Sequence, residues 1–128
     1  MKIAEVSEKF DVSQDTIRYY ERIGLIPHVN RNKSGIRDFT EEDCRWVELI
    51  KCMRRAGLAI EVLIEYVSMF QQGDETIEAR KELLMEQREQ LIIKIEDIKK
   101  TVERLDYKIE RYEKRVVEKE KTLRRTDN

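Results

Sequence analysis

The sequence is poor in the residues that define several common classes of protein. Its 128 residues include four Gly, one Pro, two Cys and one His. Two cysteines, Cys44 and Cys52, with a single histidine are too few for a disulfide scaffold or a zinc cluster. The sequence also lacks a Gly-rich phosphate-binding loop and a nucleophile–base pair. We therefore predict that the protein is not an enzyme, binds no metal and uses no cofactor.

Long apolar runs are missing as well. The best candidate, Gly57 to Val67, contains Glu61 and Glu65, whereas a membrane span needs roughly 18–20 apolar residues. The N-terminus lacks the basic segment and apolar run of a signal peptide. We expect a cytoplasmic protein without a membrane partner.

A surplus of charge of either sign is also absent, since 26 Lys and Arg face 27 Asp and Glu, a formal net charge of −1. Taken over the whole chain, this balance argues against nucleic-acid binding. Between Thr16 and Arg37, however, the only acid is Glu21, and five bases give a local charge of +4: Arg18, Arg22, Arg31, Lys33 and Arg37. Over a Debye length of ~10 Å this local field governs attraction to a phosphate.

The C-terminal part has the pattern of a coiled coil. Two series of mostly apolar residues repeat every seven residues, offset by four, as the d and a positions of one heptad frame. We predict that dimerisation uses Leu91, Ile95, Ile98, Val102, Leu105, Ile109, Tyr112 and Val116. β-Branched residues at a with Leu at d favour two strands. The basic g positions and acidic e positions, taken on their own, favour parallel strands. The weaker alternative to a coiled coil is a long helix that folds back onto its own domain.

The N-terminal part has the proportions of a helix-turn-helix. We expect helices over 3–10 and 14–23, the second capped by Ser13 and ended by Gly24. Ile17 and Tyr20 would face the core. The opposite side would present Arg18, Tyr19 and Arg22, with Gln14 and Thr16 near the first turn.

The segment after Pro27 predicts a β-hairpin from His28 to Phe39 that turns at residues 32–35, which beside a recognition helix is a wing. Thr40 would cap a third helix that runs to about Ala56, and a fourth helix would follow over about 60–72. The predicted protein is therefore mostly α-helical, with a winged helix-turn-helix head at 1–72, a hinge at 73–76 and a coiled-coil helix at 77–128. The alternative for the head is an ordinary helical domain with a solvated basic face.

Three segments resemble the signature of the mercury-resistance-regulator (MerR) family: Thr16 to Glu21, Gly24 to Pro27 and Gly35 to Phe39. Arg54 to Leu58 resembles its second wing. The segments Ile50 to Arg54, with a lone cysteine, and Phe70 to Asp74 are similar to the NmlR/AdhR-type branch.

The resemblance implies a dimeric transcription regulator with an antiparallel coiled coil. Such regulators distort a promoter that has an over-long spacer, so that RNA polymerase can use both promoter elements. Carried over by position, Gln14, Thr16, Arg18 and Tyr19 would reach the major groove of double-stranded DNA. Backbone or minor-groove edges would be held by Arg22, Arg31, Lys33, Ile36, Arg37 and Arg54. Ile36 stands where the family commonly has Tyr, so one hydrogen bond is lost there.

The resemblance also bears on what the protein senses. Metal-sensing members use cysteines near the start of the dimer helix and in a C-terminal loop, and residues 71–82 hold no Cys or His. Cys44 and Cys52 are eight residues apart, about 12 Å along a helix, too far to share one ion. Drug-binding members need a large C-terminal domain, for which this chain has no residues.

Cys52 remains as the candidate sensor of electrophiles such as aldehydes, or of oxidants. Basic neighbours Lys51, Arg54 and Arg55 favour its thiolate, while the end of a helix opposes it. In the alternative interpretations Cys52 only packs and the effector is unidentified, or the protein is a coiled-coil adaptor that binds another protein. Cys44, between Asp43 and Arg45, is expected to be inert.

Overall fold

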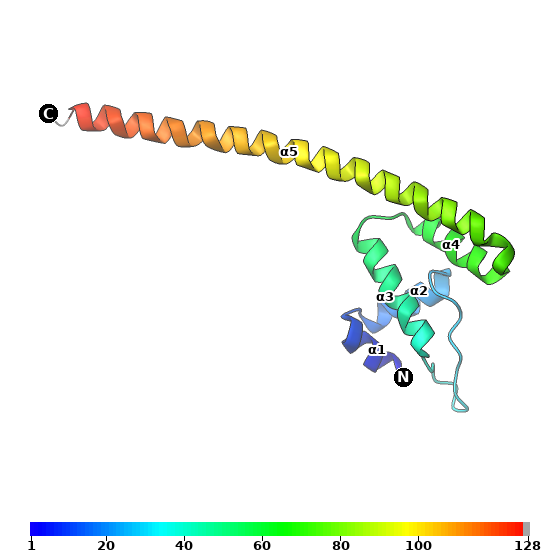
Figure 1. The fold of residues 1–128 in the computed structure, drawn as a ribbon. Coiled ribbons are helices and arrows are strands. Elements are labelled where there is room, and N and C mark those ends of the chain that lie inside the picture. The colour runs from blue at the N-terminus through cyan, green and yellow to red at the C-terminus, as the bar shows by residue number, and fades with distance from the viewer. Residues whose placement is uncertain (127–128) are drawn as a thin grey trace. The chain divides into compact units, whose positions relative to one another are not determined.

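The computed structural model describes residues 1–126, and in this range the chain is mostly α-helical (Figure 1). The helices are α1 (Ile3–Phe10), α2 (Gln14–Ile23), α3 (Glu41–Arg55), α4 (Ile60–Gln72) and α5 (Ile77–Thr126), with a short 3-10 turn, η1 (Asp74–Thr76), before α5. The chain divides into two compact units, residues 1–87 and the part that begins at Arg88. The first unit therefore contains the four short helices and the first turns of α5.

The helix-turn-helix forms where the capping residues predict it. Ser13 Oγ accepts a hydrogen bond from the Thr16 N–H at 3.1 Å and caps the start of α2. Gly24 ends α2 in the left-handed conformation at φ 84°, which a residue without Cβ adopts readily. Between α1 and α2, Asp11 takes the same conformation at φ 53°. The predicted bounds of these two helices are confirmed.

The core of the head lies between α1, α2, α3 and α4. Ile17 is fully buried and Tyr20 is nearly so, as their positions in α2 predict. Trp46 from α3 packs edge-on against Phe70 from α4 with ring centroids 4.9 Å apart. The other well-buried apolar residues include Val6, Leu25, Ile26, Val29, Val47, Ile50, Leu63 and Val67. This core orients α2 so that the face opposite Ile17 and Tyr20 is turned to solvent.

The wing differs from the predicted β-hairpin. A single antiparallel bridge joins Arg31 to Arg37, and no strand is formed in the described residues. The loop is closed instead by its own polar groups, because Asn32 Oδ1 accepts hydrogen bonds from the N–H groups of Ser34 and Ile36. The turn itself is where it was predicted, with the Gly35 N–H bonded to the Asn32 carbonyl at 3.0 Å. A side chain has thus replaced part of the ladder that two strands would supply.

The junction between α4 and α5 is closely hydrogen-bonded. Thr76 Oγ1 contacts the carbonyl oxygens of Met69 at 2.6 Å and Gly73 at 2.7 Å. Arg80 donates from Nε to Thr76 Oγ1 at 3.0 Å and lies over the Phe70 ring. Residues 73–76, predicted as a hinge, therefore form a hydrogen-bonded turn in this structure. Hinge motion of this segment stays a prediction.

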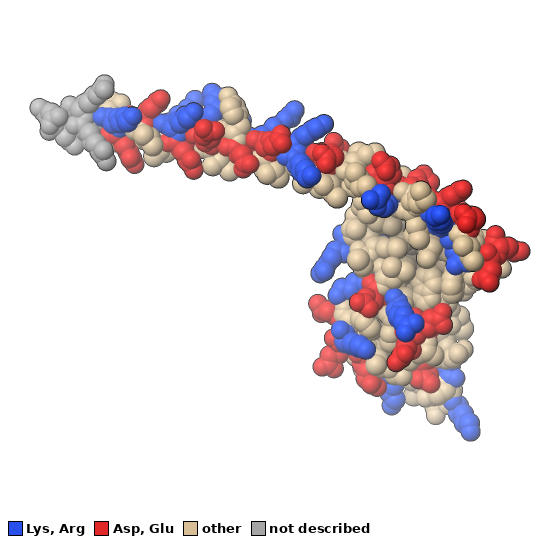
Figure 2. Space-filling model, in the orientation of Figure 1, with Lys and Arg blue, Asp and Glu red and all other residues tan. Residues whose placement is uncertain are grey.

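Helix α5 runs without a break to Thr126, since no Gly or Pro interrupts it. Figure 2 shows acidic and basic side chains interspersed along it. Seven of the eight residues of the predicted dimerisation series are about half exposed or more in the single chain, from Val102 at 48 % to Tyr112 at 64 %. This exposed stripe is what an unpaired coiled-coil seam presents, but the dimer itself stays a prediction. None of the described helices is both long and apolar enough to span a membrane.

Candidate functional site

The outer face of α2 carries the side chains predicted to read DNA. Arg18, Tyr19 and Arg22 lie on the side of the helix opposite Ile17 and Tyr20, where solvent reaches them. The Arg22 guanidinium lies 5.4 Å from the centre of the Tyr19 ring, which is a cation–π contact. The helix thus presents a cationic and aromatic face to solvent.

Arg18 is hydrogen-bonded to two neighbouring side chains of α2. Its Nη1 donates to Asp15 Oδ1 at 3.0 Å, and its Nη2 donates to Gln14 Oε1 at 3.3 Å. Asp15 lies one residue before the basic segment 16–37, so the local charge of that segment does not include it. Its spacing of three residues from Arg18 on one helix face was the signal that could have found it. The guanidinium is thereby oriented and partly neutralised.

The wing presents its cations unequally. Lys33 and Ile36 are exposed near the tip of the loop, and Arg31 donates from Nη1 to the Gly35 carbonyl at 2.8 Å. Arg37 differs, because its Nε donates to Glu21 Oε1 at 2.7 Å and only 22 % of its side chain is exposed. The structure thus groups Arg31, Lys33 and Ile36 on one exposed loop and sets Arg37 apart.

Glu21, which the local charge balance treats only as an opposing charge, is a buried member of this site. Its side chain is 7 % exposed, and its carboxylate binds Arg37 and the Val29 N–H. Burial disfavours its ionisation, but the hydrogen bonds from Arg37 and Val29 outweigh that cost and lower its pKa below the ordinary value. Glu21 follows Ile17 by four residues, so it lies on the core-facing side of α2. This spacing is the feature of the sequence that predicts its burial.

Arg54, the predicted contact of the second wing, serves the head itself in this structure. Its Nη1 donates to the Leu58 carbonyl beyond the end of α3. Burial raises the pKa of Tyr20, and the positive charge of Arg54 offsets part of that shift. Arg54 therefore stabilises the turn after α3, whether or not it also meets a phosphate.

The two cysteines lie in different environments. Cys52, on the last turns of α3, is exposed in the single chain, which does not match the alternative in which it packs in the core. Two of its basic neighbours are engaged, because Lys51 donates to the Phe10 carbonyl and Arg54 to that of Leu58. No three His, Cys, Asp or Glu side chains of the described residues gather into a metal-binding group.

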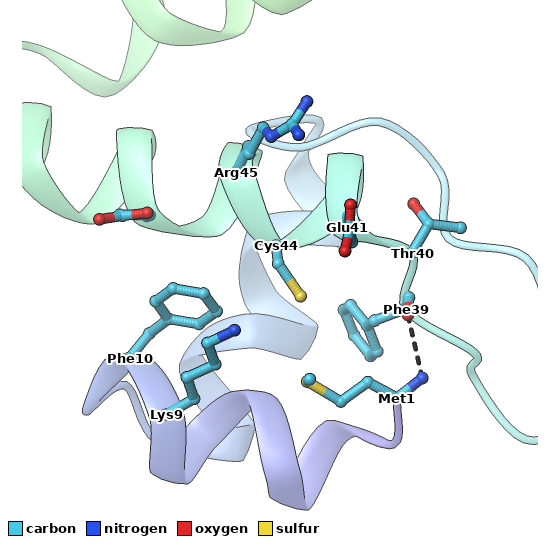
Figure 3. Close-up of a pocket in the computed structure, with 9 residues that line it drawn as sticks. Met1, Lys9, Phe10, Phe39, Thr40, Glu41, Cys44 and Arg45 are labelled. Atoms are coloured by element: carbon cyan, nitrogen blue, oxygen red, sulfur yellow. Dashed lines mark hydrogen bonds between the residues drawn. The ribbon is translucent and has the colours of Figure 1, made fainter.

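Cys44 is buried beside an open hollow of about 520 Å³ between α1 and the start of α3 (Figure 3). The hollow is lined by Lys9, Phe10 and Phe39 among others. Burial raises the pKa of the Cys44 thiol, an effect that the nearby charge of Lys9 only partly offsets. The thiol is therefore held in its unreactive protonated form at neutral pH.

The two thiols are expected to react with iodoacetamide at different rates. In the folded protein at about pH 8, close to the pKa of an ordinary thiol, Cys52 should be alkylated first, because Cys44 is only 7 % exposed and its pKa is raised. Peptide mass spectrometry over time measures both rates in one sample. The same reaction in denaturant is the control and should bring the rates together. Equal rates in the folded protein would contradict the assignment of Cys44 as the protected thiol.

Comparison with known proteins identifies the family of this head. Residues 1–69 match the family model for MerR HTH family regulatory proteins. The chain belongs to the MerR family. Residues 44–107 match a second model, described as MerR, DNA binding.

Several relatives and structures are similar over much of the chain. HTH-type transcriptional regulator AdhR of Bacillus subtilis is 58 % identical over 92 residues, which are 72 % of this chain and 66 % of AdhR, just under two thirds of that protein. A crystal structure of a MerR family regulator from Listeria monocytogenes aligns with a TM-score of 0.92 at 48 % identity, covering 99 % of this chain and 96 % of that one.

A third relative is seen with its ligand. HiNmlR, a MerR family regulator lacking the sensor domain, was crystallised bound to promoter DNA. It aligns with a TM-score of 0.81 at 32 % identity over 88 % of this chain and 90 % of its own. The named relatives are transcriptional regulators, which supports the prediction that this MerR family protein is not an enzyme.

Proposed function

We propose that this MerR family protein is a dimeric transcriptional regulator that binds double-stranded promoter DNA through α2 and the wing. The observation that carries the proposal is the outer face of α2, where Arg18, Tyr19 and Arg22 are ordered by neighbouring side chains and open to solvent together. HiNmlR, a relative of similar fold, is known bound to promoter DNA.

In this proposal some residues contact the base edges and others contact the DNA backbone. The N-terminal half of α2 would enter the major groove, with base edges read by Gln14, Thr16, Arg18 and Tyr19. Arg22 would meet the DNA backbone or the minor-groove edges, as would the wings through Arg31, Lys33, Ile36 and Arg54. Arg37, also predicted to do so, is paired with Glu21 in this structure. Arg18 would donate two hydrogen bonds to a guanine edge by exchanging its present partners, Asp15 and Gln14, for the base.

The exposed stripe of α5 supports the dimeric part of the proposal, since seven apolar residues in one register are about half exposed and need a partner. A second copy of the chain would cover them, in the antiparallel orientation that the family resemblance implies. The two heads would then meet DNA at a fixed spacing. Distorting a promoter with an over-long spacer would align its elements for RNA polymerase.

The proposed signal is an aldehyde or another electrophile, or an oxidant, that reacts with Cys52. With an aldehyde, the thiolate sulfur adds to the carbonyl carbon, a C–S bond forms, and the former carbonyl oxygen takes a proton to give a hemithioacetal. The exposure of Cys52 supports this step. Added volume on the last turns of α3 would shift the head and so change how the DNA is held.

The salt dependence of binding tests the DNA-binding proposal. A site selected from random DNA should be bound with an affinity that falls steeply as salt rises, with a slope of about −0.9 per phosphate contacted. Arg18→Ala should weaken binding by roughly 1–3 kcal/mol and relax the selected sequence. The control is Lys100→Ala, which removes one exposed charge from α5.

Two alternatives predict other outcomes. A coiled-coil adaptor would show no salt-dependent binding to any selected DNA, and Arg18→Ala would change nothing there. A regulator with an unidentified effector would bind DNA as proposed but would not respond to aldehydes or oxidants through Cys52.

A further inference from the structure

The wing is attached to α2 through one carboxylate. Glu21 Oε2 accepts a hydrogen bond from the Val29 N–H at 2.7 Å, on the arm that enters the wing. Glu21 Oε1 accepts from Arg37 Nε at 2.7 Å, on the arm that returns. Each oxygen therefore holds one arm of the loop to the helix that carries Arg18.

The interior of the loop does not depend on Glu21. The Asn32 N–H donates to the Ile36 carbonyl at 2.8 Å, and the Asp38 N–H donates to the Asn30 carbonyl at 2.7 Å. The two ends of the loop are anchored by Val29 and Phe39, which are 0 % and 3 % exposed. Without Glu21 the loop would keep its shape and its anchors but would be free to tilt on α2.

We infer that Glu21 is a positioning residue that sets the angle of the wing, residues 29–37, on the recognition helix, and that Arg37 acts through Glu21 rather than as a DNA contact. The inference rests on the proposed function. Arg37 is paired with a nearly buried carboxylate, so the exposed wing cations that can meet phosphates are Arg31 and Lys33. The hydrogen bond from the Val29 N–H also holds the Glu21 carboxylate in this position.

Positioning by Glu21 and direct contact of Arg37 with DNA predict opposite results for Glu21→Gln. If Arg37 were a phosphate contact, removing the charge of Glu21 would free it, and DNA would be bound more tightly with a steeper salt slope. If Glu21 positions the wing, binding should weaken about tenfold, and the slope should become shallower by ~0.9 for each phosphate that the tilted wing no longer reaches.

The experiment compares wild type with Glu21→Gln, Arg37→Gln and the double variant on a DNA site selected by the wild type. Arg37→Gln breaks one of the two bonds of Glu21, and Glu21→Gln weakens both of them. The double variant should therefore bind no more weakly than Glu21→Gln alone. Hydroxyl-radical footprints should lose protection at the sugars that the wing covers, while protection of the sugars beside α2 persists. Glu65→Gln, an exposed acid of α4, is the control and should bind as wild type does.

Amide hydrogen exchange tests the positioning role of Glu21 in the absence of DNA. Peptides covering residues 29–37 should exchange faster in Glu21→Gln and in Arg37→Gln, while those of α1 and α3 stay as protected as in wild type. Unchanged exchange in the wing, or tighter DNA binding by Glu21→Gln, would overturn the inference. A wild type that fails to bind DNA while the exchange result holds would instead refute the proposed function and leave the role of Glu21 intact.

Discussion

Leu105→Lys is expected to convert the protein from dimer to monomer and to reduce its affinity for DNA about a hundredfold or more. Leu105 is a d position of the seam, and its side chain is 56 % exposed in the single chain. Pairing would bury it, and burying a Leu contributes about 1.5–3 kcal/mol for each copy. A lysine at this position removes the stabilisation from buried Leu105 in both chains and places a charge in the apolar seam.

The loss in DNA affinity follows from linkage of the two heads. Two linked heads bind about 10²–10⁴ times more tightly than one, because the second contact is intramolecular. The isolated helix should also lose helicity, since a long helix with no partner for its apolar stripe is marginal in water. Sedimentation velocity, circular dichroism and DNA titration measure the three effects.

Tyr107→Lys is the matched control for this prediction. Tyr107 is 61 % exposed, much like Leu105, but two residues further along the helix it falls outside the a and d positions. The variant should remain a dimer and bind DNA as wild type does. A dimeric Leu105→Lys protein would show that the seam has been assigned to the wrong face of α5.

Cys52→Ser is expected to leave DNA affinity unchanged and to abolish the response to aldehyde. The thiol is exposed, and exchanging an exposed sulfur for oxygen changes stability by about 0.5 kcal/mol or less. The hydroxyl is a far weaker nucleophile at neutral pH, so no stable adduct forms. Footprints and transcription on a selected promoter, with and without formaldehyde, measure binding and response separately.

Cys44→Ala is the matched control for the sensor. It removes the other thiol, which is 7 % exposed, while Cys52 remains. This variant should respond to aldehyde as wild type does, apart from a modest loss of stability from the small cavity. If Cys52→Ser still responds and Cys44→Ala does not, the sensor is Cys44, beside the hollow shown in Figure 3. A response in both would support an effector that uses neither thiol.

Local chemistry made most of the head predictable. Ser13 and Gly24 define the ends of α2 through a side-chain cap and a left-handed residue, and both signals act within a few residues of the chain. The same holds for Thr40, whose capping box with Asp43 starts α3. The wing was harder, because the choice between strand pairing and a loop closed by Asn32 depends on side-chain geometry that periodicity does not report.

The candidate site was predictable as a set of positions but not as a set of contacts. The helical period alone places Arg18, Tyr19 and Arg22 away from the core. It does not say that Asp15 orients Arg18 or that Glu21 takes Arg37 away from solvent. A count of charges treats all cations of a segment alike, whereas burial and pairing decide which of them a phosphate can reach.

The amino-acid sequence specifies the caps and bounds of the helices, the core-facing stripe of α2 and the seven-residue repeat of α5, because each depends on neighbours within one or two turns. It also determined that a near-neutral chain can carry a basic face, since charge acts over about a Debye length. Only the tertiary structure decided which cysteine is exposed and which is buried. It alone showed that Glu21 joins both arms of the wing to α2, because Val29 and Arg37 lie eight and sixteen residues away and meet the carboxylate only when the chain is folded.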